Sequence, residues 1–252
     1  MASKIQYRAD FIAGLAGIVV LNAANLLLIT ILVYQFHTLK GWTVWQLIFL
    51  YSLWVLCHSL YSVFFLHVSD LENALVNGSF DQYLLRPISP LVQFLGGEVQ
   101  YLGFSDAFLG VAGLTLGYIH LKLNWTPWEF AFLLVSILSG ATIEVTIALA
   151  LSSIAFWTVR SRATIYVMSQ FEGVIQQYPL NIFGKWFRIA TTVVLPVAFM
   201  NYYPALFLLH KNILGAGCEW LKFMSPVVAV VLLCITGLVW RLGIAHYEGT
   251  GS

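Results

Sequence analysis

The stretch Trp45–Leu66, WQLIFLYSLWVLCHSLYSVFFL, carries no charged residue and decides the class of fold. A run of this length, wound as an α-helix, crosses the roughly 30 Å hydrocarbon core of a bilayer. A second uncharged run, Phe11–Tyr34, precedes it, and a short polar turn with the single charge Lys40 lies between them. Inside a bilayer the backbone must satisfy its own hydrogen bonds, which favours helices. We therefore expect an all-α polytopic membrane protein.

The composition of the whole chain supports this expectation. Of the 252 residues, 60% are hydrophobic and 9% are charged, whereas soluble domains carry roughly 25% charged residues. The net charge of +1 excludes a nucleic-acid-binding module, because that class needs a strongly basic surface. The three cysteines stand apart from one another and have neither disulfide nor metal-ligand spacing. We expect no metal site.

Six apolar runs are long enough to be read as membrane spans. They cover about residues 11–34, 45–66, 99–121, 128–157, 163–179 and 223–241 of a single transmembrane domain that includes the whole chain. The first run exceeds the roughly 7–15 apolar residues of a secretory signal, so we expect it to be retained as a span. Over the first four spans, Lys and Arg are more numerous on the side of the N-terminus, which predicts a cytoplasmic N-terminus.

Residues 186–209 admit two readings. The uncharged run Ile189–Leu209 is long enough to cross the membrane, but Pro196 and Pro204 interrupt it. Each proline removes a backbone donor and disfavours helix in the residue before it. Irregular backbone is tolerated at membrane depth where protein packs against it. We favour a re-entrant helical hairpin, with turns at these prolines and at Pro179, over a crossing helix.

The loop at about residues 68–90 contains the sequence SDLENALVNGSFDQYLLRPISP. Apolar residues recur at helical spacing on both sides of an Asn-Gly-Ser breaker. Ser79 and Gln82 have the spacing of a capping box, which predicts a helix that starts at Phe80, and Pro87 ends it. Two readings of this short amphipathic helix stay open. Either it rests on lipid at the membrane surface, or it docks into a cytoplasmic partner.

The residues Gly78–Pro87, GSFDQYLLRP, resemble the loop after the second span of ABC transporter permeases of the type 2 exporter superfamily, in particular a bacterial six-span branch. The stretches QYPLNIF (Gln177–Phe183) and LPVAF (Leu195–Phe199) agree with it, and the likeness covers nearly the whole chain. The resemblance implies an exporter permease in the bacterial inner membrane, with the hairpin between its fifth and sixth spans. It also implies an ATPase-coupling helix made of Phe80, Asp81, Gln82, Tyr83, Leu84, Leu85, Arg86 and Pro87.

The sequence contains no ATPase motif, and this absence indicates that the chain works with a partner subunit. A P-loop reads G-x-x-x-x-G-K-[ST], and the pair Gly184-Lys185 is followed instead by Trp186. We therefore expect no catalytic residues and no cofactor in this chain. The resemblance implies that ATP and Mg are bound by a separate cytoplasmic ABC ATPase subunit. Because six spans make half of an ordinary transporter, we also expect a second permease, either another copy or a related paralogue. The sequence does not indicate the substrate.

Five polar residues within the predicted spans are candidate site residues: Asn22, Asn25, Asp106, Glu144 and Glu172. An ionisable group at the centre of a bilayer costs about 2.5–3.5 kcal/mol on insertion scales, so it should face protein or water. Two roles stay open for these residues, as part of a translocation path or as interhelical polar contacts. We expect His58, which has no partner at ligand spacing, to be an ordinary core histidine. Gly113 and Gly117 have a spacing that indicates close helix packing.

Other classes of function stay open. An ion-coupled secondary transporter would use Glu144, Asp106 or Glu172, but would normally have paired repeats, and no internal repeat is evident in this sequence. A membrane scaffold of an envelope assembly or secretion system is a further alternative. Membrane-embedded catalysis would need clustered nucleophiles, metal ligands or an acid–base pair, and the sequence indicates none.

Overall fold

The computed structural model describes residues 2–36, 38–158, 160–215 and 217–247. These residues are mostly helical, and none of them belongs to a β-strand; one isolated bridge joins Leu39 and Trp42. The expected all-α class is therefore confirmed for the described part of the chain.

The helices fall into a long and a short set. The long helices are α1 Ala2–Phe36, α2 Val44–Phe64, α6 Gly103–His120, α7 Pro127–Ser153, α9 Arg162–Gln177 and α12 Ser225–His246. The short α-helices are α3 Leu71–Val76, α4 Asp81–Leu84, α5 Pro90–Leu95, α8 Ala155–Thr158, α10 Lys185–Ile189 and α11 Tyr202–Leu208. The remaining helical turns are η1 Leu66–Asp70, η2 Leu180–Ile182, η3 Ala190–Val194, η4 Val197–Phe199 and η5 Glu219–Phe223.

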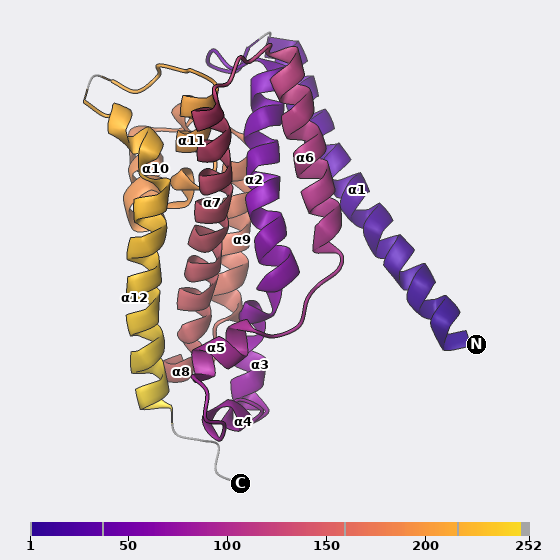
Figure 1. Ribbon diagram of the computed structural model, residues 1–252, viewed down its shortest axis with the longest axis vertical. Helices are drawn as coiled ribbons and strands as arrows, with labels where there is room; N and C mark the ends of the chain where they lie inside the picture. Colours follow the sequence, from indigo (N-terminus) through magenta and orange to yellow (C-terminus); the bar gives the residue numbers. More distant parts are fainter. Residues whose placement is uncertain (1, 37, 159, 216, 248–252) are drawn as a thin grey trace.

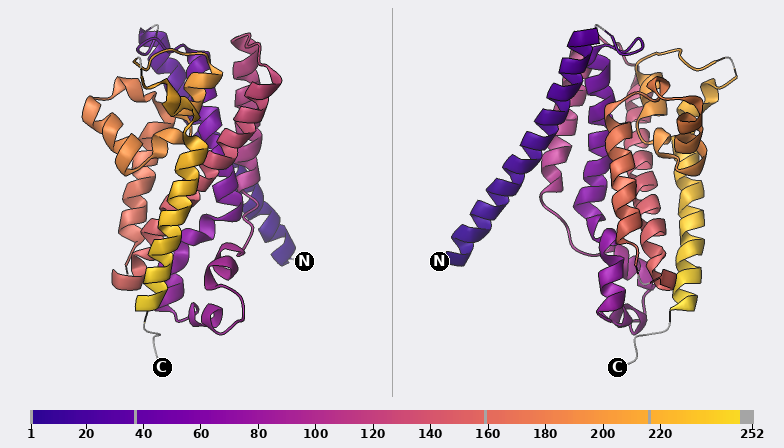
Figure 2. Two further views of the ribbon diagram at one scale, coloured as in Figure 1. Left: turned by 60° about the vertical axis from the view of Figure 1, so that its left-hand side comes forward. Right: turned by 180° about the vertical axis from the view of Figure 1, so that it is seen from behind.

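The long helices run along the long axis of the molecule, and the short ones gather at its two ends (Figure 1). The helices α3, α4, α5 and α8 lie at the end where α1 begins and α12 finishes. The helices α10 and α11 lie in the opposite half. Helix α1 leans away from the bundle, so that its first turns stand apart from the other helices (Figure 2).

Polar residues set where two central helices begin. Thr43 and Gln46 form a reciprocal capping box at the start of α2. Thr126 and Glu129 do the same at the start of α7, where Pro127 occupies the first helical position. Such boxes satisfy backbone N–H groups that have no partner within the helix. Both long apolar helices are thereby anchored at the same end of the bundle (Figure 1).

Helix α2 forms the centre of the core, and glycines of α6 let the two helices approach closely. Four glycines of α6 face α2: Gly103, Gly110, Gly113 and Gly117. A methyl group on Gly110 would lie 2.7 Å from Leu56 Cγ, and one on Gly113 would overlap the side chain of Ser52. The expectation of close packing at Gly113 and Gly117 is confirmed, and the seam extends over the length of α6.

Within the described residues, three helices could cross a bilayer by length and composition: α2, α12, and α7 together with α8 as Pro127–Thr158. The pair α10–η3 and η4–α11 would make a fourth candidate if it is counted as one span. Helix α1 has a shorter apolar part, Ala13–Leu28. Helix α9 has 16 residues and would rise only about 24 Å at 1.5 Å per residue. The count of six spans and their boundaries therefore stay predictions.

The segment predicted to be a hairpin is sharply bent. Its halves, Lys185–Val194 and Val197–Leu208, meet at 82°, with Pro196 at the break. Pro204 lies in the first turn of α11, where a proline is tolerated because no helical N–H is lost. The re-entrant hairpin, which the sequence favours over a crossing helix, stays a prediction.

The predicted capping box of the 68–90 loop is wrong. Helix α4 covers only Asp81–Leu84, and Ser79 makes no cap bond to it. The Phe80 N–H bonds back to the Ala74 carbonyl at 3.0 Å, and the Ser79 hydroxyl donates to the same carbonyl at 3.3 Å. Gly78, with φ +69°, supplies the left-handed turn that this return requires. Ser79 thus closes the end of α3 instead of starting α4.

The glycine seam generates a stability prediction. Gly110→Ala should lower the free energy of unfolding by about 1–3 kcal/mol, because the added methyl group overpacks the contact with Leu56. The matched control is Gly237→Ala in α12, where no atom lies within 4 Å of the new methyl group; this variant should melt at or slightly above the temperature of the unchanged protein. Thermal unfolding in one detergent measures both. Equal melting temperatures for the two variants would contradict the seam.

Candidate functional site

The predicted coupling residues lie in a helical loop, residues 66–95, that joins α2 to the linker before α6, and Phe80 holds this loop to the bundle. Phe80 is fully buried. Its ring centroid lies 5.3 Å from that of Phe156, 5.9 Å from Trp240 and 5.5 Å from Tyr247. An apolar face was expected here for either lipid or a partner, but Phe80 is covered by α8 and α12 of the chain itself.

The outward face of the 66–95 loop lies one turn further on. Leu84, Leu85 and Ile88 are exposed by 43%, 85% and 56%. Gln82, Arg86 and Pro87 are exposed as well. Asp81 accepts a hydrogen bond from the Tyr247 hydroxyl at 3.0 Å, and Tyr83 packs edge-on against Phe94. We call Leu84, Leu85 and Ile88 the apolar tip. Of the predicted coupling residues, Leu84 and Leu85 present large exposed apolar side chains for docking.

A carboxylate of the same loop caps α9. Glu72 Oε2 accepts the N–H groups of Ser161 at 2.5 Å and of Arg162 at 2.8 Å. The two backbone donors hold the pKa of the Glu72 carboxyl below its usual value. Negative charge at a helix N-terminus also suits the helix dipole. The 66–95 loop and α9 are thus joined by a charge-assisted clasp, with Arg162 also 3.8 Å from Asp70.

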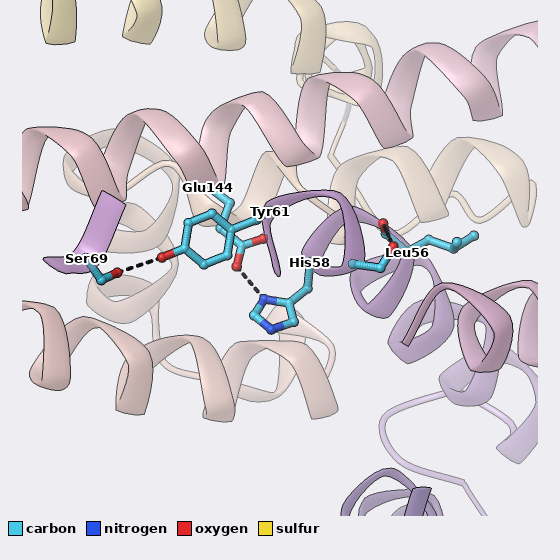
Figure 3. A network of polar contacts seen from close by, with 6 residues as sticks. Leu56, His58, Tyr61, Ser69 and Glu144 are labelled. Atoms are coloured by element: carbon cyan, nitrogen blue, oxygen red, sulfur yellow. Dashed lines mark hydrogen bonds and ion pairs between the residues drawn. The ribbon is translucent and has the colours of Figure 1, made fainter. Parts of the chain in front are cut away.

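A cavity of about 200 Å³ lies where α2, α7 and α9 meet above η1. His58 Nδ1 and Glu144 Oε1 are 2.5 Å apart, so His58 has an acidic partner that sequence spacing did not suggest. Figure 3 shows these two side chains pointing toward each other, with Tyr61 bonded to Ser69 at 2.7 Å. The lining residues are His58, Tyr61, Leu66, Ser69, Glu144, Ala148, Leu151, Ile165, Met168, Ser169 and Glu172.

The cavity is acidic, and one buried hydrogen-bond acceptor in its wall has no donor among the described residues. Glu144 is 2% exposed, and its second oxygen, Oε2, has no hydrogen-bond partner among the described residues. Glu172 of α9 is half-buried on the same cavity. No lysine or arginine lines it. Two of the five predicted polar residues, on separate helices, therefore converge on one space.

The other three predicted polar residues form a separate network. Asn22 donates to Asp106 Oδ1 at 3.0 Å and accepts from the Tyr51 hydroxyl at 2.7 Å. Asn25 donates to the same hydroxyl at 3.2 Å and accepts from Gln177 at 2.9 Å. These bonds join α1, α2, α6 and α9. The structure brings these residues together as interhelical contacts, and none of them lines the cavity.

Sequence reasoning missed three members of the two groups: Tyr51, Tyr61 and Gln177. His58 and Tyr61 are three residues apart, a spacing that puts them on one face of α2, and this could have indicated the cavity wall. The predicted turn residues Pro179, Pro196 and Pro204 do not line the cavity either. Among residues with a described position, no group of three or more His, Cys, Asp or Glu side chains could hold a metal ion.

Comparison with known proteins gives one match. A sequence model of the family described as ABC-2 family transporter protein matches residues 19–251. No curated protein and no solved structure matches the chain.

The Glu72 clasp generates a pH-dependent prediction. Glu72→Ala should lower the melting temperature at pH 7, because loss of a helix cap costs about 0.5–2 kcal/mol. A carboxyl whose pKa is lower in the folded state stabilises above its unfolded pKa, near 4.3, and loses this effect as the pH falls through the folded value. The difference between the two proteins should therefore shrink below about pH 4. Glu98→Ala, at an exposed carboxylate, is the control. A difference that grows on acidification would contradict the clasp.

Proposed function

The chain belongs to the ABC-2 transporter family, and on this premise we propose that it is the membrane-spanning permease subunit of an ATP-driven exporter. Hydrolysis takes place in a separate cytoplasmic ABC ATPase subunit, which binds ATP and Mg. The absence of a P-loop from the sequence supports this division of labour. The chain sits in the bacterial inner membrane with its N-terminus in the cytoplasm.

One observation carries the proposal: the 66–95 loop presents the apolar tip on one side and reaches the cavity on the other. Leu85, the most exposed apolar residue of the tip, is 85% accessible. Ser69 and Leu66, at the start of the same loop, line the cavity. A partner that grips the tip is therefore mechanically connected to the cavity floor.

The connection has three points of attachment. Phe80 ties the loop to α8 and α12 through its ring contacts. Glu72 ties it to the N-terminus of α9, the helix that carries Glu172. The Tyr61–Ser69 bond ties it to α2. When the ATPase subunits close on ATP, displacement of the loop tilts α9 and α12 against α2, and the cavity changes the side on which it opens.

A second permease completes the transporter. Helix α1 carries exposed apolar side chains next to its Asn22 contact with the bundle, among them Val20 at 65% and Leu21 at 67%. Such a surface needs lipid or another membrane helix to cover it. A second copy or a related paralogue fits this position, and lipid covers the rest of the apolar surface.

The test is co-purification with the ATPase. The unchanged chain, purified in mild detergent, should retain a P-loop ATPase subunit that mass spectrometry identifies. Leu85→Asp should lose most of that subunit and keep its melting temperature, since the side chain is exposed in the permease alone. Leu85→Met, which preserves the apolar surface, should retain the complex.

Phe80→Asp separates docking from folding. This variant buries a charge in the aromatic contact with Phe156 and Trp240, so the permease should lose stability itself. Full transport in vesicles that lack nucleotide and ATPase would overturn the proposal in favour of an ion-coupled carrier. Retention of envelope-assembly proteins without any ATPase would favour the scaffold role.

A further inference from the structure

We propose that the cavity between α2, α7 and α9 binds a small organic cation with an ammonium head, and that this is the substrate class of the transporter. The second half of this statement rests on the proposed permease function; the binding itself does not. Four properties of the cavity carry the inference: its charge, an unsatisfied acceptor, its apolar wall and its size.

The charge of the cavity calls for a cation. Glu144 and Glu172 both line it, and His58 is the one basic side chain that does so. His58 Nδ1 and Glu144 Oε1 lie 2.5 Å apart, and a protonated imidazole beside an ionised carboxylate forms a pair with no net charge. Glu172 then remains as a carboxyl group that forms no ion pair with any side chain that the structure describes. Glu172 is only half-buried, and a carboxylate without a basic partner offers a counter-charge to a bound cation.

An acceptor is already in position. Glu144 is 2% exposed, yet its Oε2 has no donor among the described residues. A buried acceptor without a partner costs about 1–3 kcal/mol. The three N–H groups of a primary ammonium ion can donate to this oxygen and to the Glu172 carboxylate together. The ammonium group of a bound ligand would thus supply the hydrogen-bond donor that Glu144 Oε2 lacks in the chain itself.

The remaining wall suits the carbon part of an organic cation. Tyr61, Leu151, Ile165 and Met168 line the cavity beside the carboxyl groups. Aromatic faces attract ammonium ions, and the Tyr61 hydroxyl is turned toward Ser69, as Figure 3 shows. A bare metal ion would need several oxygen or nitrogen ligands, and no three His, Cys, Asp or Glu side chains among the described residues are grouped so that they could hold one.

The volume limits the size of the ligand. The cavity measures about 200 Å³, whereas sites for drug-sized molecules are roughly 300–1,000 Å³. It therefore takes a compact alkylammonium ion and excludes large lipids or peptides.

The orientation of His58 is supported by an aromatic neighbour. The Trp54 ring stacks on the His58 imidazole, with centroids 4.6 Å apart, while His58 Nδ1 faces Glu144.

The experiment uses the full chain purified in detergent, with thermal unfolding as the readout. Butylammonium chloride should raise the melting temperature in a saturable way, because a ligand that binds only the folded state stabilises it. Sodium chloride at the same ionic strength and 1-butanol, which has no charge, should give no saturable rise. Glu172→Gln should weaken butylammonium binding at least about tenfold, as expected when a charged hydrogen-bond partner is lost. Glu98→Gln, which alters an exposed carboxylate outside the cavity, should bind normally.

The unchanged protein and the Glu172→Gln variant together decide the main point. A saturable rise with butylammonium that Glu172→Gln suppresses supports the site. An equal rise with sodium chloride would assign the cavity to an alkali metal ion and overturn the proposal. No rise with any probe would leave the carboxyl groups occupied by a proton alone and overturn it as well. If an ATPase is retained but butylammonium does not bind, the cation site is refuted and the permease function stands. If butylammonium binds but no ATPase is retained, the permease function is refuted and the cation site stands.

Discussion

A fully buried acidic side chain in an apolar helix bundle is costly unless a polar partner on another helix meets it, and two such pairs organise the interior of the molecule. Glu144 meets His58 across the α2–α7 contact, and Asp106 meets Asn22 across the α1–α6 contact. Unpaired, each would carry a desolvation cost of several kcal/mol. The pairs therefore fix which faces of the long helices meet, and apolar packing fills the space between them.

The same constraint separates two kinds of polar residue that look alike in the sequence. The network around Tyr51 is closed, since each amide found a partner on a neighbouring helix. The cavity around Glu144 is open, because one of its oxygens remains without a donor. A closed network holds helices together, whereas an open one has capacity for a guest. This difference supports assigning packing to the first group and binding to the second.

The sequence predicted the helical class and close helix packing at Gly113 and Gly117, because uncharged runs and glycine spacing are local signals, but it did not indicate that α2 is the helix that packs there. It also named five polar residues, which the structure places in two groups: Glu144 and Glu172 at the cavity, and Asn22, Asn25 and Asp106 in the network around Tyr51. It could not pair Glu144 with His58, since that contact joins residues far apart in the chain and leaves no pattern at short spacing. The orientation of Phe80 was missed for a related reason: amphipathic spacing identifies an apolar face but not what covers it. The Ser79 capping box failed because the backbone turns back toward α3 at this point: the Phe80 N–H and the Ser79 hydroxyl both donate to the Ala74 carbonyl, and α4 begins only at Asp81.

The glycines of α6 have a mechanical consequence. With Gly110 and Gly113 packed directly against Leu56 and Ser52, α2 and α6 are in close contact, and a shift in register would bring larger side chains into this contact. The two helices form the stationary frame of the bundle. Rearrangement must then be confined to the other side, where α12 meets the frame through α7 and α9 is a short strut with its own clasp. The position of the glycines, concentrated where α6 faces α2, thus distinguishes a closely packed half of the bundle from a half that can move.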